Sequence, residues 1–369
     1  MGAHKYLYKA IYGTLKQEIL DGVYPCGTLL PSERVICERF KVERTTARKA
    51  LELLVSNELV EKRAGIGTEV VYNRNVLAAP SKAQTIGFFI NEEDCVKRIT
   101  QPYYADLFYY LERECNANHQ QLIYSNIGTV ADLQEISRKY PFQAIIFITK
   151  TNPALLEQGR QMDIPLLLIN EEYDGIPSMY CDHMGGATLA LDHLAQMGHK
   201  RIGIISGPKG YLSTTHMMAA CYQQIAELGL EIPLENIVYG DWAYQSGYEA
   251  ALRLVCERRS GQRPTAIFAF NDIMAVGAIR ALRNHAISVP EEVSVIGFDN
   301  MEQLKFSEPE LTTVDSNTEG LAKLVVESIS RSALSLYAQG AKLIVPVTLI
   351  KRKTVTAVRC STGTECLPP

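Results

Sequence analysis

The sequence predicts two fold classes in one chain: an α+β segment at the N-terminus, followed by an α/β segment of two doubly wound parallel-sheet lobes. Three observations lead to this. The chain has 369 residues, more than one domain usually holds. Residues 5–72 show three helical patterns and then two short strand patterns. From residue 84 on, short apolar runs alternate with helical stretches, which is typical of parallel sheets covered by helices.

The composition excludes several classes of protein. Hydrophobic residues make up 47% and charged residues 21%, as in ordinary globular proteins. No apolar run approaches the roughly 20 residues of a membrane span, and the N-terminus lacks the apolar core of a secretory signal. The nine cysteines form no Cys-x-x-Cys pair and are odd in number, as expected of reduced thiols. We therefore expect a cytoplasmic protein, without a membrane span or a disulfide scaffold.

The first helix is predicted over residues 5–22, where apolar side chains recur at every fourth position. Ser32 can cap a short second helix over Glu33–Phe40. A third helix is predicted from Arg44 to about Asn57, followed by strands over residues 59–62 and 68–72. Glycine between these strands permits a tight hairpin. A helix, a helix-turn-helix and a β-hairpin in this order predict a winged helix.

The third helix carries candidate DNA-reading side chains at its start. Arg44 and Arg48 are four residues apart, so they share one face, opposite the predicted core residues of the helix. Arginine there can bind the O6 and N7 atoms of guanine with two hydrogen bonds. The other candidates from this region are Arg34, Thr45, Thr46, Lys62, Arg63 and the hairpin tip at Gly65. The alternative is an ordinary solvated helix face.

The charge distribution supports this only weakly. Residues 1–75 contain 12 basic and 9 acidic residues, while the rest of the chain is net acidic. A strongly basic patch, which many DNA-binding domains show, is therefore not predicted.

Three stretches of the N-terminal segment resemble the GntR-type winged helix. They are Gly27-x-x-Leu30-Pro-Ser-Glu-Arg34, Phe40-x-Val42-x-Arg44-Thr-Thr-x-Arg48-x-Ala50-Leu51 and Gly65-x-Gly67-Thr68-x-Val70. The resemblance implies DNA contacts by Arg34, Arg44, Thr46, Arg48 and the Gly65 tip. Glu43 departs from the family, which usually has serine there; an acid suits the helix dipole but repels phosphate.

The long segment is predicted to contain eight strands. They cover residues 86–90, 121–124, 144–149, 166–169, 201–206, 237–239, 266–270 and 293–298. The domain boundaries that follow are a winged helix over residues 1–73, a linker over 74–83, an effector domain over 84–355 and a tail over 356–369.

Five motifs of this segment resemble the effector domain of LacI/GalR repressors, which is itself of the periplasmic-binding-protein type. They are Asp182-x-x-x-Gly186, His193-Leu-x-x-x-Gly-His199-x-Arg201-Ile, Asn271-Asp-x-Met-Ala-x-Gly277, Val289-Pro-Glu-x-Val-Ser-Val-Ile-Gly-Phe-Asp299 and Leu311-Thr-Thr-Val314. A GntR-type reader joined to such a domain resembles the AraR-type arabinose repressors.

This resemblance implies a ligand held between two lobes at the carboxyl ends of strands. The effector-binding candidates are Tyr103, Tyr104, Asn170, Asp182, Thr215, Trp242, Asn271 and Asp299. The sequence does not choose between the two tyrosines. The alternatives are that Asn271 and Asp299 cap loops and that Trp242 belongs to the core.

One departure from the family concerns the ligand. Sugar-responsive members carry an arginine near the start of the helix after Ser206-Gly-Pro, whereas this chain has none over residues 213–220. An arginine that could donate two hydrogen bonds to hydroxyls or to a carboxylate is therefore missing. The ligand is then not an ordinary free sugar, or other residues supply the polar contacts, or the cleft holds no ligand.

Patterns of catalytic, cofactor or metal chemistry are missing. The histidines lack zinc-protease spacing, no Cys/His cluster occurs, and no phosphate loop or Gly-x-Ser-x-Gly turn appears. We therefore expect no enzyme, cofactor or metal. The sequence predicts a ligand-responsive transcriptional regulator, a repressor, that binds palindromic operator DNA as a homodimer with a sugar or sugar-like effector. The alternative is a metabolite-binding sensor that acts through protein contacts.

Overall fold

The computed structural model describes residues 4–20, 23–25, 27–56, 59–63, 67–70, 84–91, 101–162, 164–304, 308–330 and 340–358. The chain divides into two compact units, Met1–Ala83 and Gln84–Pro369. Gly65, the predicted linker over 74–83 and the tail from residue 359 lie outside the described residues. Among the described helices, none has the length and apolar character that a membrane crossing requires.

The first unit is a winged helix, as predicted. Its elements are α1 (His4–Leu20), α2 (Glu33–Phe40), α3 (Arg44–Ser56), β1 (Val60–Arg63) and β2 (Gly67–Val70). The strands pair antiparallel, with Val60 opposite Val70. Ser32 accepts a hydrogen bond from the backbone of Val35 and so caps α2. Lys41 ends α2 in the left-handed region, which turns the chain toward α3.

The core of this unit follows the predicted helical periodicity. Of the apolar residues at every fourth position of α1, Ile11, Leu15 and Ile19 are buried, but Leu7 is 39% exposed. The predicted core side of α3 is buried throughout. The buried residues of this core are Ile11, Leu15, Ile19, Leu30, Ile36, Ala47, Ala50, Leu51, Leu54, Leu59, Val60 and Val70.

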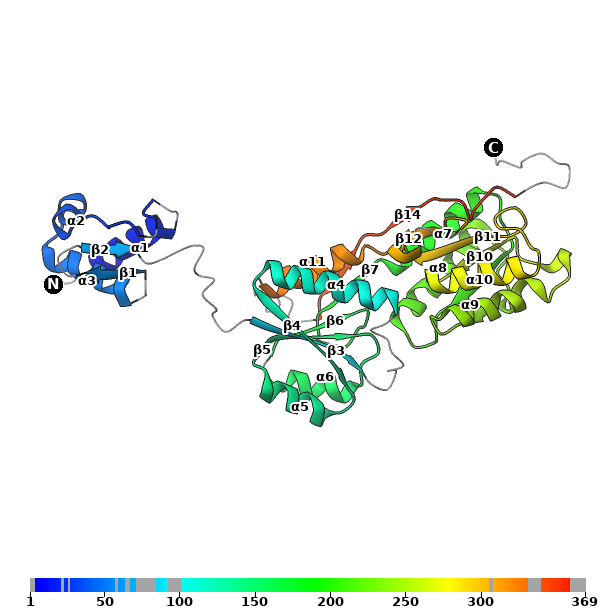
Figure 1. The fold of residues 1–369 in the computed structure, drawn as a ribbon, viewed down its shortest axis with the longest axis horizontal. Helices are drawn as coiled ribbons and strands as arrows, with labels where there is room; N and C mark the ends of the chain where they lie inside the picture. Colours follow the sequence, from blue (N-terminus) through cyan, green and yellow to red (C-terminus); the bar gives the residue numbers. More distant parts are fainter. Residues whose placement is uncertain are drawn as a thin grey trace. The chain divides into compact units, whose positions relative to one another are not determined.

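The second unit contains two six-stranded sheets (Figure 1). The first has the strand order β13-β7-β6-β5-β3-β4, with all neighbours parallel. Its strands are β3 (Gln84–Asn91), β4 (Gln120–Ile127), β5 (Phe142–Ile148), β6 (Leu166–Ile169), β7 (Ser178–Cys181) and β13 (Lys342–Val345).

Helices cover both faces of this sheet (Figure 1). On one side lie α4 (Pro102–Ala117) and α11 (Thr318–Ser330), and on the other α5 (Val130–Lys139) and α6 (Pro153–Arg160). Each face has its own buried core, because successive strand side chains point to opposite faces.

The second sheet has the order β14-β12-β11-β10-β8-β9, and only β14 runs antiparallel to its neighbour. Its strands are β8 (Ile202–Ser206), β9 (Ile237–Tyr239), β10 (Ala266–Ala269), β11 (Ser294–Asp299), β12 (Thr312–Asp315) and β14 (Thr348–Ile350). Its α-helices are α7 (His183–Gln196), α8 (Leu212–Leu228), α9 (Tyr244–Ala251) and α10 (Asp272–Asn284). Helix α7 packs against α8, and α9 packs against α10.

The chain passes from one lobe to the other between β7 and α7, between β12 and α11, and between β13 and β14. The prediction of two doubly wound lobes is therefore confirmed, and the eight predicted strands are all present, six of them with shifted ends. Four further strands, β7, β12, β13 and β14, were not predicted from the sequence.

Candidate functional site

The start of α3 carries two arginines that share one acidic partner. Arg44 donates from Nε to Glu33 Oε2 at 2.9 Å, and Arg48 donates from Nε to Glu33 Oε1 at 3.2 Å. Glu33 is the first residue of α2, so it ties the two helices together. The arginine side chains still expose 76% and 53% of their surface. Both guanidinium groups are therefore held on one solvent-facing surface.

The carboxylate of Glu33 stays charged at neutral pH. Its hydrogen bonds from Arg48 and then Arg44 lower its pKa to about 2. A DNA backbone or base that binds these arginines meets two cations and one fixed anion.

The other predicted DNA contacts belong to the same unit. Arg34 is 86% exposed and has a long ion pair of 3.8 Å with Glu38. Thr45 and Lys62 are exposed, while Thr46 is half-buried. Arg63 is 2.9 Å from Glu69, so its charge is partly balanced within the hairpin. These assignments remain predictions, as does that of Gly65.

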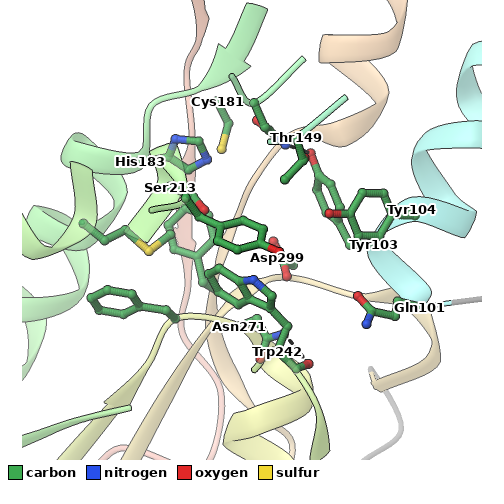
Figure 2. A pocket seen from close by; sticks show the side chains of 15 residues that line it. Gln101, Tyr103, Tyr104, Thr149, Cys181, His183, Ser213, Trp242, Asn271 and Asp299 are labelled. Carbon is green, nitrogen blue, oxygen red and sulfur yellow. Dashed lines mark hydrogen bonds between the residues drawn. The ribbon is translucent and has the colours of Figure 1, made fainter. Parts of the chain in front are cut away.

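A pocket lies in the second unit and is lined by residues of both lobes (Figure 2). Six of the eight predicted effector-binding residues line it. The lining residues are Gln101, Tyr103, Tyr104, Thr149, Asn170, Cys181, His183, Tyr211, Ser213, Met217, Trp242, Phe270, Asn271, Phe298 and Asp299. Many of them follow or end strands, in agreement with a site at the carboxyl ends of parallel strands.

Two predicted residues, Asp182 and Thr215, do not line this pocket. The carboxylate of Asp182 accepts a hydrogen bond from the Gly185 backbone and caps α7. The hydroxyl of Thr215 donates to the Tyr211 carbonyl one turn earlier in α8. Both side chains therefore have local partners.

Asn271 and Trp242 are joined at the pocket wall. The side-chain oxygen of Asn271 accepts from the Met274 backbone at 2.8 Å and caps α10. Its side-chain nitrogen donates to the Trp242 carbonyl at 3.0 Å. Trp242 has a φ of +70°, a conformation that a bulky residue rarely adopts. Asn271 therefore caps a helix, as the alternative interpretation held, and also lines the pocket.

On the opposite wall, the side-chain nitrogen of Asn170 donates to the Tyr103 hydroxyl at 2.5 Å. Asn170 directly follows β6 and has a φ of +55°, which asparagine tolerates better than most residues. This bond fixes Tyr103 beside Tyr104, whose ring meets it edge to face (Figure 2).

Asp299 lies between the two walls (Figure 2). Burial first, and then the neighbouring carboxylates of Asp272, Asp106 and Asp315, raise the pKa of Asp299 well above its usual range. Asp272 is also buried and accepts hydrogen bonds from Thr313 Oγ1 and the Met301 backbone. Burial raises the pKa of Asp272 to about 7.

The sequence predictions missed nine lining residues. Among them, His183 directly follows Asp182, and Met217 follows Ser213 by one helical turn. A helix that begins near residue 212 places residues four apart on one face, so this spacing was an available signal. Met217 now occupies a pocket position on the helix where an arginine was expected and is missing.

Comparison with known proteins follows this division of the chain. Residues 7–70 match the model of the bacterial regulatory proteins of the gntR family, and residues 191–355 match a periplasmic binding protein-like domain. The transcriptional repressor CytR of Escherichia coli K12 is 28% identical over 232 residues, or 59% of this chain. This chain spans 65% of the length of CytR. The repressor PurR of Salmonella newport is 28% identical over 268 residues, 69% of this chain and 76% of PurR.

Solved structures share the fold. The lac repressor dimer bound to operator and the anti-inducer ONPF matches with a TM-score of 0.66 at 21% identity, over 78% of this chain and 100% of that chain. The regulator CelR in complex with cellobiose matches with a TM-score of 0.66 at 19% identity, over 85% and 92% of the two chains.

Proposed function

Because the chain joins a GntR-type winged helix to a LacI-like domain of the periplasmic-binding-protein type, we propose that it is a cytoplasmic transcriptional repressor. It binds operator DNA through the winged helix as a homodimer, and a small effector bound between its lobes controls that binding. It carries out no catalytic turnover. The similarity to the repressors CytR and PurR supports this role.

The observation that carries the DNA-binding role is the paired presentation of Arg44 and Arg48 at the start of α3. The two side chains remain largely exposed although both bind Glu33. This arrangement reduces the number of conformations available to two long side chains before DNA arrives. Each guanidinium can then donate two parallel hydrogen bonds to guanine or phosphate.

The effector role is supported by the pocket. Its lining residues come from both lobes, so a ligand that contacts both can stabilise one arrangement of the lobes over another. The change in operator affinity can be no larger than the ligand's preference between the two states. A sugar or sugar-like metabolite is the proposed effector class.

A mobility-shift assay with DNA from upstream of the chain's own coding region tests the proposal. The Arg44→Ala variant is expected to lose about 1–3 kcal/mol of specific binding energy, with a smaller loss of non-specific binding that reflects the removed positive charge. The matched control is Arg138→Ala, an arginine of the second unit. Equal specific binding by Arg44→Ala and the wild type contradicts the assigned reading helix.

A further inference from the structure

The effector pocket combines many aromatic rings with few charges. The aromatic lining residues are Tyr103, Tyr104, Tyr211, Trp242, Phe270 and Phe298. Neither lysine nor arginine occurs among the described residues that line it. Among the lining residues that the structure describes, Asp299 alone has a carboxyl group.

Neither Met217, on the helix where the family resemblance implies an arginine, nor His183 gives the pocket a positive charge. Met217 is 2% exposed and presents a thioether from α8. His183 is 4% exposed, and burial, followed by the nearby His216, lowers its pKa to about 3. His183 is therefore neutral near pH 7. Lys150 lies outside the lining, with its exposed ammonium 5.6 Å from the centre of the Tyr211 ring.

The pocket also contains buried polar atoms without a protein partner. Asn170 Oδ1 and His183 Nδ1 have none within the part of the chain that the structure describes. The oxygen of Asn170 can only accept a hydrogen bond, and neutral histidine has one accepting nitrogen. Buried polar atoms are rarely left unpaired in native proteins, so these atoms indicate a missing partner.

We propose that this pocket selects an uncharged ring compound rich in hydroxyl or amino donors, which contacts His183, and discriminates against phosphorylated and carboxylated forms of that compound. The inference rests on the proposed effector role of the pocket. Free sugars and nucleosides share this chemistry. Their rings can pack on the aromatic walls while their donors meet Asn170, His183 and Asp299.

The discrimination follows from desolvation. A phosphate or carboxylate that enters the pocket loses its hydration and meets no cation among the described lining residues in return. An uncharged hydroxyl compound loses much less hydration and pairs with acceptors that are otherwise unpaired.

Thermal unfolding of the full chain with matched compounds tests the proposal. The pairs are ribose and ribose 5-phosphate, glucose and glucose 6-phosphate, glucose and glucuronate, and cytidine and cytidine 5′-monophosphate. We expect at least one neutral compound to raise the melting temperature while its charged counterpart does not. A response to a sugar pair or to the nucleoside pair shows which of these two compound classes the pocket binds. The proposal is overturned if no neutral compound raises the melting temperature, or if a charged counterpart raises it as much or more.

A charge introduced at Met217 should reverse the selection. Met217→Arg and the smaller change Met217→Lys are expected to bind the charged counterpart and to weaken the neutral compound by about tenfold. The matched control is Met184→Arg, because Met184 is 40% exposed on α7 and does not line the pocket. Unchanged selection in the folded Met217 variants contradicts the charge argument.

His183→Phe keeps a planar ring but removes both nitrogens. We expect the dissociation constant of the neutral compound to rise by about tenfold. His216→Phe is the control, because His216 packs near His183 but does not line the pocket. Equal affinity of His183→Phe and the wild type overturns the His183 contact.

Operator binding is measured on the same preparations. Loss of ligand selectivity with intact DNA binding refutes this inference and leaves the repressor role standing. Selective ligand binding without any DNA binding refutes the repressor role and leaves the pocket chemistry standing.

Discussion

His183 is a buried side chain that the folded protein holds in its neutral form. Its pKa is about 3 in the folded protein, against an ordinary value of 6.5. Below pH 6.5 the unfolded chain therefore binds a proton that the folded chain does not bind until about pH 3. Stability is lost as the pH falls through this window, by about 2 kcal/mol from this residue at pH 5. The His183→Phe variant should lack this loss.

The wild type alone cannot isolate this effect, because Asp272 contributes with the opposite sign. Its pKa of about 7 makes the folded chain bind a proton more readily than the unfolded chain between about pH 7 and 4, which adds stability as the pH falls. The measurement is therefore the difference between wild type and His183→Phe in urea unfolding at pH 7 and pH 5. Trp242, the only tryptophan of the sequence, reports the second unit by its fluorescence. The same pH dependence in both proteins contradicts the prediction.

At the scale of elements, Glu33 connects α2 to α3 by holding Arg44 and Arg48, the two proposed DNA-reading arginines. Glu33→Gln removes the carboxylate that holds the two guanidinium groups and raises the net charge by one. We expect tighter non-specific DNA binding with a steeper salt dependence, and a loss of about tenfold in the ratio of operator to non-specific affinity.

The control for that change is Glu52→Gln. Glu52 is an exposed residue of α3 and acts on Arg48 only through space, so this substitution changes the net charge equally. Fluorescence anisotropy with operator and scrambled duplexes over a salt series gives both affinities. If the two variants lower the ratio of operator to non-specific affinity equally, Glu33 affects specificity only through its charge and not by holding the arginines.

Asn271 joins helix α10 to the pocket wall, and its two roles can be separated. Asn271→Ala removes the helix cap and should lower the free energy of unfolding by about 1 kcal/mol. Asn271→Ser can keep the cap but not the bond to the Trp242 carbonyl. We expect near wild-type stability with weakened effector binding in the serine variant, measured by urea unfolding and calorimetry. Wild-type effector affinity in Asn271→Ser contradicts a positioning role for the Trp242 contact.

The sequence was sufficient for elements with a strong local pattern. Helix α2 and strand β6 have the predicted ends, because a capping serine and a continuous apolar run are local signals. Strands β13 and β14 were missed, since their pairing with β7 and β12 depends on partners far away in the sequence.

The pocket shows the same limit. Asp299 was available from a motif and Trp242 from the family resemblance, whereas the position of Met217 depends on which face α8 turns toward the other lobe. The contact of Glu33 with Arg44 likewise depends on how α2 crosses α3, a tertiary arrangement that spacing along one helix does not specify. Side chains positioned by packing between elements are thus the ones that sequence patterns predict least well.

At the scale of the whole molecule, the proposed homodimer would present two winged helices to one palindromic operator. Once the first reader is bound, the second binds from a high effective concentration, because the dimer interface holds it near the DNA. A full palindrome should therefore bind at least 100-fold more tightly than a duplex with one half-site replaced. Titrations of both duplexes at the same salt concentration measure this ratio. A duplex with both half-sites replaced gives the non-specific baseline. Equal affinity for the full and the half operator would indicate that only one winged helix binds each DNA site. Ligand control would then have to act within one chain, and not through the spacing between the two winged helices of a dimer.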